Sequence, residues 1–360
     1  MGQSSHAHHA IRVAVAGVGN CASSLVQAAS AAAGTAAGSI GVPRPLFGGY
    51  AVGDITFAAA FDVDDRKVGR DLAEAIVSPP NCTSSYVQVP ATGVRVRCGP
   101  LADGIGPLTR DLVQVAGDAA RVSFADVTAA LTAAAADVLI AYLPVGSARA
   151  TAGYAGAALD AGVAFVNCNP ERVATDPAWQ RKFADAGVPL LGDDIKSQLG
   201  ATTLHRMLID LCTSRGAVID RTYQLNVGGN TDFLNMRDPG RAAAKRASKM
   251  SALEARLDGD TEFGAGPSDY IKHLSDRKVA YINLEGRSLL GMPFSIEAKL
   301  EVEDSPNSAG VAIDAIRAAK TAADRGIGGP VHDACAYLFK IPATPSSDRE
   351  AEELIDRFSR

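Results

Sequence analysis

A glycine-rich turn near the start of the chain has the spacing of a phosphate-binding loop. Residues 17–22 read Gly-Val-Gly-Asn-Cys-Ala, between the apolar run Ile11–Ala16 and a segment with helical periodicity, Ala22–Ala33. Glycines let the backbone approach a pyrophosphate, and the N–H groups at a helix start favour its negative charge. This strand–turn–helix setting predicts a dinucleotide site, with an ordinary tight turn as the alternative. The predicted cofactor-binding residues of this turn are Gly17, Gly19, Asn20, Cys21 and Ala22.

A carboxylate at the end of the second apolar run, Ile55–Val63, is placed to hold the ribose of such a dinucleotide. Asp62 lies 45 positions after Gly17, where about 20 is usual. We interpret the Gly- and Pro-rich stretch 34–54 as an insertion that accounts for the excess. An acid here favours NAD over NADP because it would repel a 2′-phosphate. A later strand ends in a loop that we expect to pass the cofactor, with contacts from Leu143, Pro144 and Gly146.

Two adjacent carboxylates and a lysine follow a later apolar run, in the sequence Gly-Asp-Asp-Ile-Lys-Ser-Gln at 192–198. We expect Asp194 and Lys196 to face the cofactor. A helix from about Ala201 would offer its first N–H groups and nearby hydroxyls to a substrate phosphate. The predicted phosphate-binding residues are Ser197, Gln198, Ala201 and Thr202. A helix cap with surface acids is the alternative interpretation of this segment.

Lysine is scarce in this chain, with 10 Lys against 25 Arg, and eight of the ten lie at or after Lys196. Arg stays protonated, whereas burial can tune Lys to release its proton, so a lysine here can mark proton-transfer chemistry. A solvated surface position is the plainer alternative. Lys245 and Lys249 are i,i+4 neighbours on one predicted helix face. Short polar side chains at 226–232 (Asn-Val-Gly-Gly-Asn-Thr-Asp) follow a strand and either read hydroxyl groups or form a turn.

Composition excludes several classes of protein. The chain has 360 residues, 47% of them hydrophobic and 21% charged, so it can bury a large core and is not disordered. Its net charge of −5 argues against a nucleic-acid partner. Six cysteines without CxxC spacing, and a polar start without an apolar signal region, predict a cytoplasmic protein. The most apolar stretch, 127–146, contains Asp137 and Pro144, so we expect a helix and a strand rather than a membrane span.

Helical segments alternate with short apolar runs through the first half of the chain, which is typical of a doubly wound parallel sheet. The expected strands are Ile11–Ala16, Ile55–Val63, Val94–Arg97, Val138–Leu143, Val163–Val166 and Val188–Leu191. The expected helices between them are Ala22–Ala33, Asp65–Ile76, Phe124–Ala136, Ser147–Ala161 and Trp179–Ala186. After Gly192 we expect helices at Ala201–Arg215, Ala242–Leu257, Ser308–Arg325 and Asp348–Arg360. The remaining expected strands are Ala217–Val227, Val279–Glu285 and Phe294–Val302, the last two forming an antiparallel, half-exposed sheet.

Taken together, these segments resemble the inositol-3-phosphate synthase family, most closely its actinobacterial type. The resemblance runs from about Arg12 to Pro342 and is carried most specifically by GDDIKSQ, NVGGNTD and EDSPNSAG, with GVGNCASSL, YLPVGS and RGIGGPV in support. It implies an enzyme that binds NAD tightly and oxidises C5 of glucose 6-phosphate. The resulting ketone is enolised at C6, C6 attacks the C1 aldehyde, and the ring ketone is reduced, so no net redox change occurs.

The resemblance also implies which residues act and how the chain is organised. The implied catalytic residues are Lys245, Lys249, Lys278, Lys340, Asp194, Asn226, Asn230 and Asp232. Lys249 and Lys278 are expected near the phosphate and enolate, and Lys245 and Lys340 near the C1 and C5 oxygens. Clustered lysines should depress one another's pKa and serve as base and cation. Asp304 is implied as a cofactor contact and as the contact of a cation beside the nicotinamide.

The expected architecture is a Rossmann-like sheet formed by residues 1–195 and 305–360, with an inserted α+β catalytic and oligomerisation domain at 196–304. The resemblance implies a homotetramer and a small sugar-phosphate substrate. The segments 169–172, 237–244 and 264–269 depart from the family pattern, which leaves the sugar open. One alternative is a related cyclase of secondary metabolism closing fructose 6-phosphate to a five-membered cyclitol phosphate. Others are a net NAD-dependent dehydrogenase and a non-catalytic NAD-sensing module.

Overall fold

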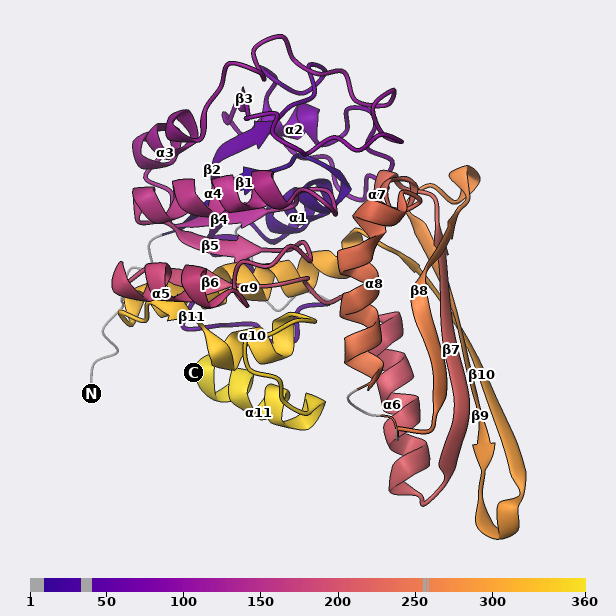
Figure 1. The fold of residues 1–360 in the computed structure, drawn as a ribbon. Coiled ribbons are helices and arrows are strands. Elements are labelled where there is room, and N and C mark those ends of the chain that lie inside the picture. The colour runs from indigo at the N-terminus through magenta and orange to yellow at the C-terminus, as the bar shows by residue number, and fades with distance from the viewer. Residues whose placement is uncertain (1–9, 34–40, 255–256, 258) are drawn as a thin grey trace, which may run out of the picture.

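Two β-sheets organise the part of the chain that the computed structural model describes, residues 10–33, 41–254, 257 and 259–360 (Figure 1). The larger sheet has seven parallel strands in the order β11-β6-β5-β4-β1-β2-β3. Its strands are β1 (Ile11–Ala16), β2 (Ile55–Asp62), β3 (Val96–Cys98), β4 (Val138–Ala141), β5 (Ala164–Asn167), β6 (Pro189–Leu191) and β11 (Gly329–Pro330). The doubly wound parallel fold predicted from the sequence is therefore confirmed.

Helices cover both faces of this sheet, which explains why its strands are apolar without alternation. On β1, Val13 and Val15 pack toward one face and Ala14 and Ala16 toward the other. The helices of the chain are α1 (Asn20–Ala32), α2 (Leu72–Ala75), α3 (Phe124–Ala133), α4 (Ala148–Ala161), α5 (Pro177–Asp185), α6 (Ala201–Ser214), α7 (Thr231–Asn235), α8 (Pro239–Glu254), α9 (Pro306–Asp324), α10 (His332–Leu338) and α11 (Asp348–Phe358). Helices α1, α9, α10 and α11 pack on the first face, and α3, α4 and α5 on the second.

The smaller sheet has four strands in the order β10-β9-β7-β8 and stands beside the larger one, with α6 and α8 against it (Figure 1). Its strands are β7 (Val218–Gly228), β8 (Glu262–Tyr270), β9 (Arg277–Arg287) and β10 (Pro293–Glu303). Strands β9 and β10 pair antiparallel, as predicted. The chain returns to the larger sheet through α9. Whether 196–304 and the remainder fold as separate domains stays a prediction.

Sequence reasoning missed several elements. Strand β8 was not predicted because Gly264, Gly266 and Pro267 are poor strand formers, but it pairs only with β7 and so lies at a sheet edge, where proline is tolerated. The expected helix Asp65–Ile76 is wrong over most of its length, since only Leu72–Ala75 is helical. Its first residues form turns in which Asp64 bonds to Arg66 and the carbonyl of Asp64 accepts from Lys67 N–H. Helices α7 and α10 and the short β11 also had no clear periodic signal.

The strand order places a crevice where the chain reverses direction. Strands β1 and β4 are neighbours, and successive strands lead away from them on opposite sides. In open α/β sheets, ligands bind at the carboxyl ends of the strands at this point. The turn after β1 and the loop after β4 meet there. A Cβ added to Gly17 would lie 2.6 Å from the carbonyl oxygen of Tyr142. None of the described helices is long and apolar enough to cross a membrane.

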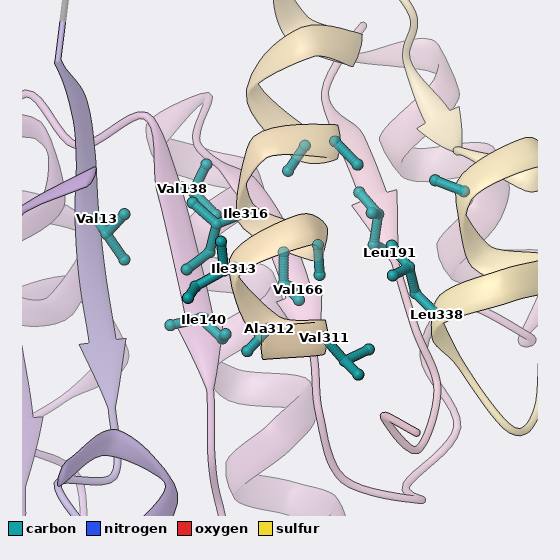
Figure 2. Packing of buried hydrophobic residues seen from close by; sticks show 14 of the residues in the cluster. Val13, Val138, Ile140, Val166, Leu191, Val311, Ala312, Ile313, Ile316 and Leu338 are labelled. Carbon is teal, nitrogen blue, oxygen red and sulfur yellow. The ribbon is translucent and has the colours of Figure 1, made fainter. Parts of the chain in front are cut away.

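Helix α9 anchors the middle of the larger sheet (Figure 2). Ile313 and Ile316 pack against Val138, Ile140 and neighbouring strand residues, and Ile316 has no solvent exposure. We predict that Ile316→Ala lowers the free energy of unfolding by about 2–5 kcal/mol, because it loses buried methyl groups and leaves a cavity. Urea unfolding measures the difference. The control Val77→Ala, at a side chain that is 58% exposed, should change it by less than about 0.5 kcal/mol. Equal losses in both variants would contradict this packing.

Candidate active site

A cavity lies between the carboxyl ends of the larger sheet and the elements of the smaller one. Its walls come from the turn after β1, the end of β2, the loop after β4, the start of α6, strand β7 and helix α7. Its volume is about 320 Å³. Most of the predicted site residues line it: Gly17, Gly19, Asn20, Cys21, Asp62, Leu143, Pro144, Lys196, Ser197, Ala201, Thr202, Asn226, Asn230, Asp232, Lys245, Lys278, Asp304 and Lys340.

The glycine turn has the geometry that a pyrophosphate requires. Gly17 has φ +88°, a conformation that favours glycine. A Cβ added at Gly19 would meet nothing within 4 Å, so the turn is open there. Helix α1 starts at Asn20 without a side-chain cap on its N-cap residue and without an acid in its first turn. Its first N–H groups are therefore placed to bind an anion. Ala22 lies one position beyond the residues that line the cavity.

Asp62 ends β2 at the other side of this turn. Its Oδ2 accepts from Val18 N–H at 2.8 Å, and its Oδ1 accepts from the N–H groups of Val63 and Asp64 at 2.7 and 2.9 Å. The carboxylate is thus fixed against the glycine turn, where a ribose bound to the same turn would meet it. These residues fit a dinucleotide. Lys67, which sequence reasoning missed, lies 3.9 Å from Asp62 Oδ2 and donates to Val18 O.

Asp194 lies at the centre of the lysine cluster. The segment 193–196 pairs with 338–341: Asp193 N–H donates to Ile341 O, and Lys340 N–H donates to Asp194 O. This pairing brings Lys340, 146 positions away, beside Asp194. The Asp194 side chain has no solvent exposure, and its Oδ1 accepts from Lys245 Nζ at 2.7 Å and from Lys340 Nζ at 3.0 Å. One buried carboxylate therefore holds two lysines from distant elements.

The two lysines around Asp194 differ in acidity. Burial lowers the pKa of Lys340 to about 8, and the positive charges of Lys245 and Lys278 act in the same direction. Burial also opposes the charge on Lys245, but attraction by Asp194 and Asp232 raises the pKa of Lys245 above its ordinary value. Neighbouring lysines thus help to lower the pKa of Lys340, as expected, whereas nearby carboxylates dominate at Lys245. The site pairs an amine that can be neutral with a permanent cation.

Asp193 has a different role from its neighbour. It is fully buried, and its oxygens accept from Asn167 Nδ2 and from the N–H groups of residues 173–175. It therefore fixes the loop after β5. The interpretation of this pair as surface acids and a helix cap is wrong, because both side chains are buried and the N-cap of α6 is Gly200.

A second ion pair lies across the cavity. Lys278 Nζ donates to Asp304 Oδ1 at 2.8 Å. Burial alone would raise the pKa of Asp304, but the attraction and hydrogen bond of Lys278, together with the charges of Lys245 and Lys340, lower it overall. Among the described residues no group of three or more His, Cys, Asp or Glu side chains could hold a metal ion. A cation at Asp304 stays a prediction.

The start of α6 opens into the same cavity as the glycine turn. Its N-cap, Gly200, makes no side-chain cap, and its first turn contains no acid. Ser197, Ala201 and Thr202 line the cavity there. Gln198 does not, since its amide donates to Gly41 O instead. Arg206, one turn further along α6, lines the cavity and was missed, although its i,i+4 spacing from Thr202 is visible in the sequence.

Two of the three polar residues predicted to bind substrate hydroxyls, Asn226 and Asn230, form hydrogen bonds within the protein. Asn226, on the inner face of β7, donates to Gly266 O. Asn230 caps α7 through its Oδ1 and donates to Asp276 through its Nδ2. Burial raises the pKa of Asp232. All three line the cavity, but the bonds of Asn230 indicate that it shapes the turn as much as it meets a ligand.

The remaining predicted residues lie around this cluster. Lys196 Nζ donates to Ala336 O at 3.0 Å. Gly146 N–H donates to Glu171 Oε1 at 2.9 Å, and Gly146 itself does not line the cavity. Lys249 lies on α8, but its side chain is outside the described part of the structure.

Comparisons with known proteins agree with this architecture. A family described as myo-inositol-1-phosphate synthase matches residues 200–305. The chain is 51% identical over 357 residues to an inositol-3-phosphate synthase of Mycolicibacterium smegmatis, covering 97% of each chain. It is 50% identical over 358 residues to one of Corynebacterium glutamicum, covering 97% of this chain and 98% of that one. A solved myo-inositol-1-phosphate synthase-related protein of Thermotoga maritima matches with TM-score 0.83 and 26% identity over 98% of both chains.

Half of all positions are thus shared with curated synthases along nearly the full length of the chain. The resemblance inferred from the sequence motifs is confirmed: the chain belongs to the inositol-3-phosphate synthase family and is an enzyme of this isomerase-type family.

Proposed function

We propose that the protein cyclises glucose 6-phosphate to 1D-myo-inositol 3-phosphate, with NAD as a recycled cofactor. The single observation that carries the proposal is the convergence of three features on one cavity. The glycine turn and Asp62 fit a dinucleotide, the start of α6 fits a substrate phosphate, and the Asp194 cluster supplies a base and a cation. When bound, NAD⁺ supplies the hydride acceptor for C5 and later the donor that reduces the ring ketone.

The remaining chemistry belongs to the side chains. Oxidation at C5 acidifies the protons on C6, and a base must remove one of them. Lys340 suits this role because its pKa of about 8 leaves part of it neutral near physiological pH. Lys245, whose pKa is raised, remains a cation and stabilises the oxyanion that develops. The C6 carbanion then adds to the C1 aldehyde, and a lysine ammonium returns the proton to the new alkoxide.

Phosphate recognition needs no redox change and uses groups already aimed into the cavity. The N–H groups at the start of α6 and the hydroxyls of Ser197 and Thr202 would bind the phosphate. Lys278, held by Asp304, lies in the wall of the same cavity and contributes positive charge. Substrate and product have the same atoms and oxidation level, so the cycle is an isomerisation.

We further propose that four copies assemble. On the outer face of the smaller sheet, Tyr223, Leu225 and Tyr281 are each more than 40% exposed, and Leu225 is the register partner of Tyr281. Charges of both signs flank this strip, including the Arg221–Glu285 pair, and we take it as one interface between copies. On α6, Met207 and Leu211 form a second exposed apolar surface. A tetramer of dihedral symmetry needs two surfaces per chain that each pair with a second copy, and these two exposed apolar surfaces are our candidates.

Product analysis tests the reaction. We expect the purified protein, with catalytic NAD⁺, to convert glucose 6-phosphate to inositol 3-phosphate by NMR without lasting NADH absorbance. Lys340→Met should yield no product, since it removes the amine proposed as the base, whose pKa burial lowers to about 8. A five-membered cyclitol phosphate from fructose 6-phosphate alone would support the alternative sugar. NADH accumulating in step with sugar consumption would establish a dehydrogenase instead.

The pH dependence of turnover tests the role of Lys340. Its ammonium must lose a proton before it can act as a base, so kcat should rise with pH and level off above its pKa of about 8. Asp194 raises the pKa of Lys340 by attraction. Asp194→Asn should therefore lower overall activity and move the rise to lower pH. A flat profile, or a rise that Asp194→Asn leaves in place, would rule out Lys340 as the titrating base.

Light scattering in solution tests the assembly. The wild-type chain should have the mass of four copies. The double variant Leu225→Glu/Tyr281→Glu should give dimers, because it places charge in a strip that the proposed interface would bury. Met207→Glu/Leu211→Glu should also give dimers, through loss of the second surface. A monomeric wild-type chain, or unchanged mass in both variants, would contradict the proposal.

A further inference from the structure

Two side chains of the smaller-sheet half reach across to the loops that wall the cofactor end of the cavity. Arg241, on the first turns of α8, donates from Nη1 to Val145 O at 3.2 Å and from Nη2 to Asp103 O at 2.5 Å. Asn235, at the end of α7, donates from Nδ2 to the same Val145 O at 2.8 Å and is 2% exposed. Sequence motifs identified neither residue.

The loops that receive these side chains belong to the cavity wall. Leu143, Pro144 and Val145 line the cavity after β4, and Leu101, Gly104 and Ile105 line it from the preceding loop. Asp103 connects the two, because its carboxylate accepts from the N–H groups of Arg149 and Ala150 at the start of α4. Arg241 therefore holds the 101–106 loop, the 143–147 loop and the start of α4 in one arrangement.

Two glycines show how closely the halves fit at this point. A Cβ added to Gly146 would lie 2.7 Å from Arg241 Cγ. A Cβ added to Gly106 would lie 2.4 Å from Asn235 Oδ1 and 2.8 Å from Arg241 Nε. Beneath them Val145 packs with Phe233, Met236 and Ala242 in a small apolar cluster that joins the halves. The contact is a packed joint between the loop after β4 and helices α7 and α8.

We propose that Arg241 and Asn235 are positioning residues that form a clasp, closing the cofactor end of the cavity and setting the rate at which NAD(H) leaves. The proposal rests on the proposed cyclase function, in which the hydride removed from C5 must return to the same sugar. Each escape of NADH before the last step would leave a two-electron-oxidised sugar, one proton and NADH in solution. Retention of the cofactor is thus a condition for an isomerisation with no net redox change.

Cofactor binding without sugar provides the first test. Three variants open the clasp in different ways: Arg241→Ala, Arg241→Lys and Gly106→Ala. The last leaves both clasp residues in place and displaces their flexible ends. We expect NADH, followed by its fluorescence, to dissociate about ten- to a hundredfold faster from Arg241→Ala. Losing a hydrogen bond from a charged group typically changes an equilibrium by about that factor. Arg241→Lys, which can reach one carbonyl, should lie between this variant and the wild type.

Turnover provides the second test. With glucose 6-phosphate and excess NAD⁺, the clasp variants should release free NADH and a matching amount of oxidised sugar, whereas the wild type should release neither. The control Arg121→Ala removes an arginine whose side chain is 84% exposed and should behave as wild type in both tests. Thermal unfolding of each variant identifies any that fail to fold. If Arg241→Ala does not fold, Gly106→Ala still provides the test.

The two proposals fail in different ways. Wild-type dissociation rates for NADH in both Arg241→Ala and Gly106→Ala would overturn the clasp, whatever the sugar chemistry. A wild-type protein that makes no cyclitol phosphate from either sugar would overturn the proposed function, while the binding experiment without sugar would still decide the clasp.

Discussion

The site depends on one buried carboxylate that two ammonium groups share. Asp194 has no solvent exposure, and Lys245 and Lys340 stabilise its charge by both donating to its Oδ1. The sharing is unequal in effect. Burial opposes the charge of both lysines. At Lys245 the attraction of Asp194 and Asp232 outweighs it and the pKa is raised, whereas at Lys340 burial, helped by the charges of Lys245 and Lys278, lowers the pKa to about 8. In the proposed mechanism, a base and an electrostatic stabiliser thus come from one residue type in two different settings.

The fold brings these three groups together from distant parts of the chain. Asp194 follows β6, Lys340 follows α10, and Lys245 lies on α8 beside the other sheet. The backbone pairing of 193–196 with 338–341 joins the first two, and α8 docks on the larger-sheet half through Arg241. Removal of either connection would separate a lysine from the carboxylate. The proposed cofactor clasp and the placement of Lys245 beside Asp194 therefore depend on the same joint between the halves.

The sequence could predict what depends on local periodicity and short motifs. The strand Ile11–Ala16, the glycine turn and the helix from Ala201 all have strong local signals, and the structure shows each of them. Strand β8 could not be predicted from its own residues, because its pairing with β7, and not its own strand propensity, makes it a strand. Gln198 looks like a phosphate ligand in sequence, but its amide reaches Gly41. Arg241 and Asn235 act across an interface, which no spacing along one chain segment reveals.

The choice of basic residue also follows from the chemistry of the cavity. Although the chain has 25 Arg and 10 Lys, five lysines line the cavity within the described residues (Lys67, Lys196, Lys245, Lys278 and Lys340), and Arg206 is the one arginine there. Arginine would hold a phosphate at least as well, through its planar fork of donors. It cannot give up its proton, however, and so cannot become a base at any pH the protein experiences. A cavity that must bind an anion and also move a proton therefore favours lysine.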